Sequence, residues 1–240
     1  MGDRLHKRSP YEGLFGITEM ISERSVLDLG YIRLIDKMGD DAEVARAARV
    51  SYGKYDDIRE WDKDAKLTKY LKDHGHTSPF EMIELKWQVK CPIFVARQWM
   101  RHRTFNFNEI SYRYTEAKDE CYNPESWRGT DVINKQSSTD GVIYGGNVYA
   151  ASRAYEKLCT AAFGTYRELL TLGVAREQAR MVLPLSTYTE FIAKNDLHNT
   201  LKFLTLRDAN GSQYEIRVYA QAMKEQIKEC LPKLSQILFS

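Results

Sequence analysis

The chain has 240 residues, of which 43% are hydrophobic and 28% are charged, a balance typical of a soluble globular protein. Its 35 basic and 33 acidic residues leave a net charge of +2, which argues against nucleic-acid binding by the molecule as a whole. Its 4 cysteines lack CxxC spacing, so neither a metal site nor a disulfide framework is expected. No apolar run approaches the roughly 20 residues of a membrane span, and no signal core follows the basic N-terminus, which predicts a cytoplasmic protein.

Short strands and helices are expected to alternate along the first part of the chain. Residues 1–25 look like a polar N-terminal extension, and the domain itself is expected to span 26–240. Alternating apolar and polar residues around Gly30 predict two short strands joined near that glycine, and Asp40 or Asp41 can cap the helix that follows. The expected elements are two strands within 26–38, a helix over 42–50, a loop over 53–62 and a helix over 63–74 that stops at Gly75.

A probable helix start precedes the clearest strand pattern of the chain. Ser78 and Glu81 have the spacing of a capping box, with proline at the first helical position. The elements expected next are a strand over 83–91, a helix over 92–103 and a strand or turn over 109–114.

The second half of the chain is expected to be mainly helical. Residues 123–147 are rich in Ser, Gly, Thr and Asn, which predicts a loop or an insertion. After it we expect a helix over 148–172 ended by Gly173, a helix over 175–183 ended by Pro184, a strand over 187–194, and helices over 197–207 and 212–230. These elements predict a single α+β domain with a mixed or antiparallel sheet flanked by helices. The chain has no GxGxxG motif, so a Rossmann fold is not expected.

Cationic and polar side chains gather within residues 97–113. Arg97 and Arg101 are four residues apart and share a helix face, and residues 101–103 place three cationic or titratable side chains in a row. If the chain is extended over 109–113, an acceptor, a hydroxyl and a cation face one side. Because the planar guanidinium of arginine binds phosphate through two hydrogen bonds, this set suits a base attached to a phosphate.

Two other interpretations of these residues remain open. The cluster can be a solvated basic helix end followed by a polar loop. With Phe105 and Phe107 among the charges, it can also be a module that binds single-stranded nucleic acid by stacking, although the near-neutral net charge argues against this.

The same residues resemble those of a known family. Arg101-His102-Arg103, then seven residues, then Ser111 is similar to the RHR motif of the flavin-dependent thymidylate synthases. The resemblance extends in order over residues 26–230. It is carried by the blocks ARAARVSYGK at 45–54, HGHTSPFE at 74–81, PIFVARQWMRHRTFNFNEISYRY at 92–114, AREQARMVLPLSTYTEF at 175–191 and LHNTLKFLTLR at 197–207.

This resemblance implies an enzyme that converts dUMP to dTMP. Methylenetetrahydrofolate would be the one-carbon donor, and NADPH-reduced FAD the source of hydride. The resemblance also implies a homotetramer whose active sites lie between subunits. Neither a nucleic acid nor a membrane is an expected partner. A member that binds nucleotide or flavin without methylating is an alternative, against which the retained motif residues argue.

The resemblance also implies residues for each ligand. For dUMP they are Gln98, Arg101, Glu109, Ser111, Tyr112, Arg113, Arg180 and Arg207. For FAD they are Ser78, Arg101, His102, Arg103, Glu109, Asp196, His198 and Lys202. Tyr112 stands where some members have glycine, and Asp196 and His198 stand where some relatives have Asn and Arg.

Three routes could make the uracil ring nucleophilic. Cys91 could attack it, but this cysteine lies among apolar neighbours in a strand and is expected to be a buried thiol. Ser111 has only Glu109 nearby as a base, which favours a binding role. The route we favour gives Arg207 the catalytic role, stabilising the deprotonated uracil imide without a covalent enzyme bond.

Overall fold

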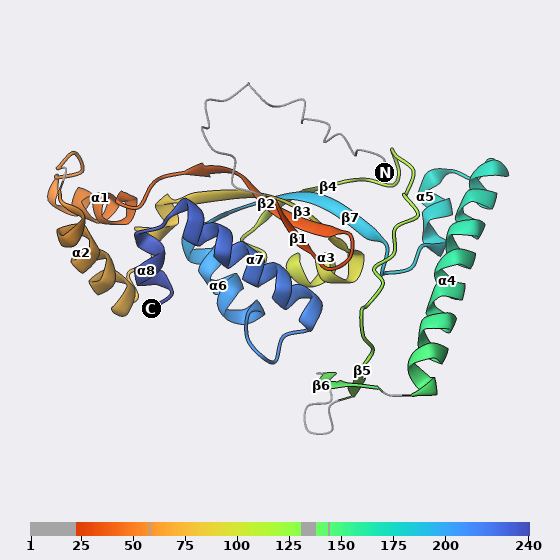
Figure 1. The fold of residues 1–240 in the computed structure, drawn as a ribbon. Coiled ribbons are helices and arrows are strands. Elements are labelled where there is room, and N and C mark those ends of the chain that lie inside the picture. Colours follow the sequence, from red (N-terminus) through yellow and green to blue (C-terminus); the bar gives the residue numbers. More distant parts are fainter. Residues whose placement is uncertain (1–22, 58, 131–137, 144) are drawn as a thin grey trace, which may run out of the picture.

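A five-stranded sheet forms the centre of the computed structural model, which describes residues 23–57, 59–130, 138–143 and 145–240 (Figure 1). The strand order is β1-β2-β3-β7-β4, and every pairing between these strands is antiparallel. The strands are β1 (Arg24–Val26), β2 (Gly30–Met38), β3 (Glu84–Pro92), β4 (Asn106–Glu109) and β7 (Tyr188–Asp196). The predicted α+β fold is confirmed, with an antiparallel sheet in place of the parallel sheet of a Rossmann fold.

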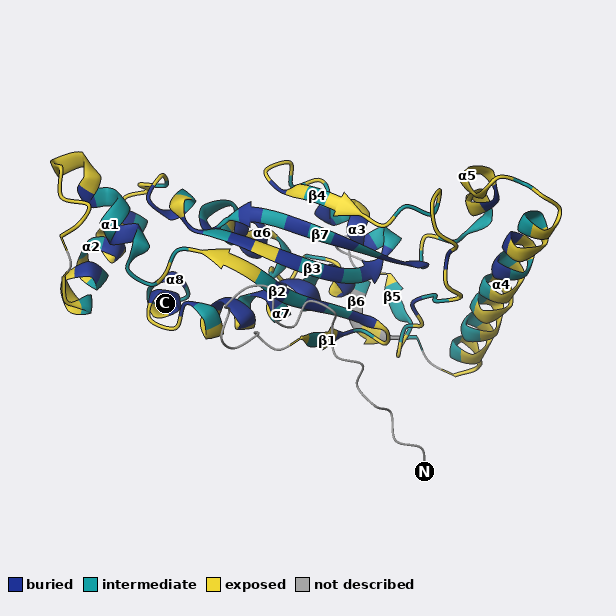
Figure 2. Cartoon of the chain, turned by 90° about the horizontal axis from the view of Figure 1, so that it is seen from above, coloured by how far each residue is buried: buried dark blue, intermediate teal, exposed yellow. Residues whose placement is uncertain are grey.

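Three helices cover one face of this sheet. They are α3 (Ile93–Trp99), α6 (Leu197–Arg207) and α7 (Tyr214–Cys230). Trp99 lies in the core between them, stacked on Phe203 at 4.7 Å between ring centroids and edge-on to Phe191 at 5.6 Å. Figure 2 views the sheet from above, where no described helix crosses the strands. The shared core therefore holds α3 and α6 against each other, and both carry predicted site residues.

A buried glutamine joins α7 to an irregularity in β2. The β2–β3 register shifts between Leu34 and Asp36. Gln226, which is fully buried, accepts a hydrogen bond from the Leu34 backbone N–H (3.1 Å) and donates one to the Ile32 carbonyl (3.2 Å). The side chain thus satisfies strand backbone groups beside the bulge.

A tight turn between β1 and β2 depends on glycine. A Cβ on Gly30 would lie 1.9 Å from the hydroxyl of Tyr219, which is buried and donates a hydrogen bond of 2.6 Å to the Lys90 carbonyl. The glycine therefore permits the close approach of β2 to α7.

The two ends of the sheet carry different helices (Figure 1). At one end lie α1 (Glu43–Arg49), a 3₁₀ turn (Val50–Tyr52), α2 (Trp61–Asp73) and α8 (Leu234–Leu238). A buried ion pair between Arg49 and Asp64 joins α1 to α2. At the other end lie α4 (Gly146–Thr171), α5 (Arg176–Ala179) and the hairpin of β5 (Arg128–Thr130) and β6 (Ser138–Val142).

The α4 end has a small core of its own. Ala117, Phe163, Tyr166 and Ala179 form this cluster, separate from the core under the sheet. The Tyr166 hydroxyl accepts a hydrogen bond of 3.1 Å from the Ala117 backbone N–H, which ties the segment after β4 to α4.

The long periodic elements agree with the sequence predictions. Confirmed are the paired strands at 26–38, the helix at 42–50, the helix ending before Gly75, the strand at 83–91, the helix ended by Gly173, the strand at 187–194, and the helices at 197–207 and 212–230. Among the helices of the described residues, none combines the length and apolar character needed to cross a membrane.

Several shorter predictions are wrong. Ser78 makes no capping bond, because only a three-residue 3₁₀ turn (Phe80–Met82) follows, with Pro79 at its N-cap. The helix predicted to reach residue 103 ends at Trp99. The expected helix over 175–183 is α5 followed by a 3₁₀ turn (Arg180–Val182), and α8 was not predicted. The described part of the expected loop at 123–147 contains the β5–β6 hairpin. The predicted extension at 1–25 lies largely outside the described residues.

Candidate active site

An open pocket of about 550 Å³ lies where the end of α3 meets the end of α6. It is lined by Phe94, Arg97, Gln98, Arg101, Leu185 and Arg207. The backbone of α3 is anchored at its start, where the Phe94 N–H donates to the Leu185 carbonyl at 3.0 Å. Arg97 and Arg101 share this pocket as their spacing predicted, although the helix itself ends between them.

Arg207, the last residue of α6, is oriented by neutral acceptors. Its Nε donates to His102 Nε2 at 2.9 Å. Its Nη2 donates to the Gln98 backbone carbonyl at 3.1 Å, and its Nη1 to Gln98 Oε1 at 3.5 Å. These contacts join the α6 end to both α3 and the turn after it.

The charge of Arg207 is left available for a ligand. Among the described residues, no carboxylate pairs with its guanidinium. Burial and the nearby charge of Arg101 lower the pKa of Arg207, although an arginine remains a cation at physiological pH. A partly buried cation without an acidic partner among the described residues favours the binding of an anion.

His102 is held neutral in this setting. Burial and the charge of Arg207 lower the pKa of His102 to about 4. Its ring also packs edge-on against Phe203 at 4.9 Å between centroids, which fixes the ring on α6. The neutral ring can therefore present Nε2 as an acceptor to Arg207.

The segment from Glu109 to Arg113 leaves the sheet and forms a turn, one of the two conformations expected for it, so it does not present an extended face. β4 ends at Glu109, and the Tyr114 and Thr115 N–H groups turn back to the Ser111 carbonyl. Thr189 on β7 donates to Glu109 Oε1 at 2.6 Å, while Ser111 Oγ accepts the Arg113 N–H at 3.3 Å. β4 pairs with β7 through Glu109, and the Ile110 N–H still donates to the Glu190 carbonyl at 2.9 Å, so the local hydrogen bonds begin at Ser111.

Tyr112 is tied back to the sheet. Its hydroxyl donates to the Tyr188 carbonyl, and burial raises the pKa of Tyr112 to about 12. The tyrosine side chain thus points into the protein, and its place in the small α4 core explains how a large residue fits here.

Arg113 and Arg180 lie beside α5 rather than in the pocket. Arg113 forms an exposed ion pair with Glu177 at 3.3 Å, and Arg180 begins the 3₁₀ turn after α5. Neither is among the residues that line the pocket in the described part of the chain. Within one chain, the predicted dUMP residues therefore form two groups, one at α3 and α6 and one at the Ser111 turn and α5.

Several of the residues predicted for FAD lie on or beside α6. Asp196 caps this helix by accepting the Asn199 N–H at 2.8 Å. His198 and Lys202 follow at helical spacing, and Lys202 is exposed. The Leu197 N–H donates to the Ile83 carbonyl at 2.8 Å, which ties the helix start to the segment that contains Ser78.

The sequence did not single out Gln213, which contacts this site, or Glu215, which contacts Gln213. The side chain of Gln213 accepts a hydrogen bond from Gln98 Nε2, and Gln213 donates to Glu215 at 2.9 Å. Both stand where α7 begins, and no motif marks them. Only the packing of α6 against α7 brings them to α3. No local sequence pattern could therefore have identified them.

Comparisons with known proteins identify the family. Residues 33–233 match the family model described as thymidylate synthase complementing protein. The flavin-dependent thymidylate synthase of Thermus thermophilus is 53% identical over 207 residues, covering 86% of this chain and 74% of the relative. That of Thermosipho africanus is 44% identical over 213 residues, covering 88% and 91%.

A solved structure agrees with these relatives. The UMP/dUMP methylase PolB from Streptomyces cacaoi, bound with 5-Br dUMP, superposes with a TM-score of 0.80 at 30% identity, covering 90% of this chain and 97% of PolB. The match of fold, family model and relatives over most of the sequence shows that the chain belongs to the flavin-dependent thymidylate synthases, enzymes that methylate dUMP to dTMP.

Proposed function

We propose that this chain converts dUMP to dTMP, with methylenetetrahydrofolate as the one-carbon donor and NADPH as the reductant of bound FAD. The observation that carries the proposal is the partly buried cation of Arg207, which is held by Gln98 and His102 and has no acidic partner among the described residues. A nucleotide whose uracil ring becomes anionic supplies the missing negative charge. The residues proposed for dUMP are Gln98, Arg101, Glu109, Ser111, Tyr112, Arg113, Arg180 and Arg207.

Arg207 is the proposed catalytic group. Its guanidinium stabilises the deprotonated uracil imide, which makes the ring electron-rich and nucleophilic. A protein thiol is a poor alternative, because burial and the nearby Glu109 raise the pKa of Cys91 well above its usual range. Ser111 suits binding, since its hydroxyl oxygen is bonded to the Arg113 N–H and the carboxylate of Glu109 is bonded to Thr189.

The residues around α6 fit FAD. Arg101, Arg103 and Lys202 are exposed, and none of them makes an ion pair within the described part of the chain. Such cations suit a pyrophosphate. The residues that would hold the cofactor are Ser78, Arg101, His102, Arg103, Glu109, Asp196, His198 and Lys202. When bound and reduced, FAD supplies the hydride that completes the methyl group.

We propose a homotetramer whose active sites lie between subunits. Support comes from the separation of the dUMP residues into two groups within one chain. Further support comes from α4, which carries the exposed side chains of Tyr149 (71% exposed) and Leu158 (59%). A second subunit could cover these side chains and bring its own Arg113 and Arg180 to the α3–α6 pocket.

Domain extent and location are proposed as the sequence predicted them. Residues 26–240 form the catalytic domain and 1–25 an extension, a boundary close to the start of β1 at Arg24. All 4 cysteines are free thiols, which suits the reducing cytoplasm.

The test is direct. The purified protein should be yellow, bleach with NADPH, and form dTMP from dUMP and methylenetetrahydrofolate, measured by chromatography. It should also restore growth of a thymidine auxotroph. Soluble, flavin-loaded protein that fails in both assays would overturn the proposal.

A further inference from the structure

We propose that Glu215 is a positioning residue that fixes the orientation of the Gln98 side-chain amide, through Gln213, and so the placement of Arg207. The inference rests on the proposed function, because it assigns a task within that active site. It is carried by a continuous series of side-chain hydrogen bonds from the α7 start to the pocket.

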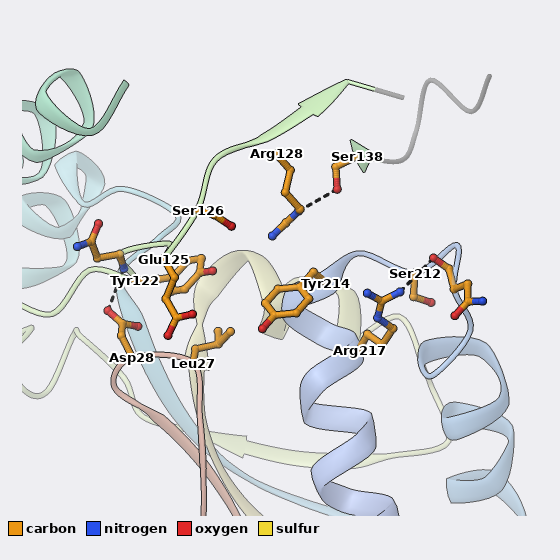
Figure 3. Close-up of a pocket in the computed structure, with 12 residues that line it drawn as sticks. Leu27, Asp28, Tyr122, Glu125, Ser126, Arg128, Ser138, Ser212, Tyr214 and Arg217 are labelled. Atoms are coloured by element: carbon orange, nitrogen blue, oxygen red, sulfur yellow. Dashed lines mark hydrogen bonds between the residues drawn. The ribbon is translucent and has the colours of Figure 1, made fainter. Parts of the chain in front are cut away.

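The series begins at a firmly held carboxylate. The Glu215 side chain is 4% exposed and faces Arg128 of β5, whose Nη2 lies 2.7 and 2.9 Å from its two oxygens. The Tyr122 hydroxyl donates to the same carboxylate at 3.2 Å. Figure 3 shows Arg128 and Tyr122 in the wall of a hollow of about 380 Å³, beside Tyr214 at the start of α7. Burial and the neighbouring Glu215 raise the pKa of Tyr122, so its hydroxyl stays a donor.

The carboxylate then dictates which way two amides point. A carboxylate can only accept, so Gln213 must turn its NH₂ group toward Glu215, where the distance is 2.9 Å. The oxygen of Gln213 is thereby left to accept from Gln98 Nε2. Gln98 must in turn direct its own oxygen away from Gln213, toward Arg207.

At the pocket, this orientation places an acceptor beside a cation. Gln98 Oε1 is 3.5 Å from Arg207 Nη1, and the Gln98 backbone carbonyl is 3.1 Å from Nη2. If the amide rotated by half a turn, its NH₂ group would face the guanidinium as a second donor, and Arg207 would lose one acceptor. Glu215 thus acts on the catalytic cation without touching the substrate.

The direct test is Glu215→Gln, which has nearly the same shape but can donate as well as accept. Both amides could then take either orientation. We expect kcat for dTMP formation to fall roughly three- to tenfold, the scale of one hydrogen bond, with little change in KM for dUMP or in FAD content. Gln213→Ala, at an exposed position, should cause the same loss while leaving the Arg128–Glu215 pair intact.

A double-mutant cycle separates positioning from a merely structural role. If Glu215 acts through Gln98, then Glu215→Gln should cause no further loss of kcat in a Gln98→Ala background. Tyr122→Phe is the matched control, because it removes a bond to the same carboxylate outside the series, and its kcat should stay near that of the wild type. An equal loss in both backgrounds, or no loss from either Glu215→Gln or Gln213→Ala, would overturn the inference. Wild-type protein that forms no dTMP would instead refute the proposed function.

Discussion

At the residue scale, Arg207 is the proposed catalytic group, and its removal should separate catalysis from cofactor binding. Arg207→Ala should lose at least about a hundredfold in kcat, because the anionic uracil loses its stabilising charge. FAD content should be retained, since the proposed FAD cations are other residues. Product formation and the flavin absorbance of the purified variant measure the two effects.

Arg207→Lys separates the effect of the positive charge from that of the guanidinium shape. Lysine keeps the positive charge, but a single ammonium cannot contact His102 and both Gln98 acceptors in the same way as the planar guanidinium. Its activity should lie between those of wild type and Arg207→Ala. Normal turnover by Arg207→Ala would remove this residue from the mechanism.

His102 should give the site a lower pH limit. As the pH falls through about 4, the folded-state pKa of His102, its Nε2 becomes a donor and the new charge repels Arg207. Because the folded pKa lies below the unfolded value of about 6.5, the unfolded chain binds the proton first. The stability due to neutral His102 is therefore fully present above pH 6.5 and declines between the two pKa values.

Calorimetry of dUMP binding between pH 4 and 8 would measure the pH limit of the site. Urea unfolding of the same samples would measure the stability due to neutral His102. His102→Gln, which retains an acceptor but does not titrate in this range, should reduce the loss of binding and of stability as the pH approaches 4. His74→Gln, at an exposed histidine remote from the pocket, should leave them unchanged. A His102→Gln profile identical to that of the wild type would assign the pH limit to another group.

The sequence indicates which candidate residues lie close together better than it predicts the contacts that hold them. Gln98, Arg101 and Arg207 come together as the family match implied, from segments more than a hundred residues apart. The sequence left strand and turn both open over 109–114, and the one-sided array of an extended chain does not form, because local hydrogen bonds at Ser111 replace strand pairing there. Gln213 and Glu215 were missed because their contacts exist only once α6 and α7 pack together.

At the element scale, Gln226 tests how α7 supports the bulge in β2. Gln226→Leu should lower the free energy of unfolding by about 2 kcal/mol, because it leaves buried strand groups without a partner. Urea unfolding measures the change. Gln221→Leu, at an exposed position on the same helix, is the control and should shift stability by less than about 0.5 kcal/mol. Equal effects would mean that the bulge is supported in another way.

Element length explains which predictions succeeded. β3, β7, α4 and α6 are each long enough to show several repeats of their apolar pattern, and all were predicted. The 3₁₀ turn at 80–82, α5, α8 and the β5–β6 strands are too short to show a period. Such elements form where surrounding contacts place them, as when Arg128 of β5 meets the buried Glu215 of α7.

At the scale of the whole molecule, the α4 end should be an assembly surface. Leu158→Glu would place a charge on an exposed apolar position of α4 and should shift the protein from the proposed tetramer to smaller species, with loss of activity. Analytical ultracentrifugation measures the assembly. Lys66→Glu on α2, which is also exposed, controls for the change of charge. An intact tetramer for Leu158→Glu would show that α4 lies outside the interfaces.

Active sites shared between subunits predict complementation between two inactive proteins. Arg207→Ala lacks the α6 cation, and Arg180→Ala lacks the cation that lies after α5. If one subunit supplies Arg207 and another supplies Arg180, a mixed tetramer contains some sites with both arginines. Random mixing of equal amounts gives about a quarter of such sites, by the symmetry of a closed homo-oligomer.

The two variants should therefore regain about a quarter of wild-type dTMP formation after being unfolded and refolded together, and none when refolded apart and then assayed at once. Co-expression with two different tags gives the same comparison without refolding. A chain that builds its whole site from its own residues could not recover activity in any mixture, because every subunit would still lack one arginine. The separation of Arg207 from Arg180 within the chain makes recovery the expected result.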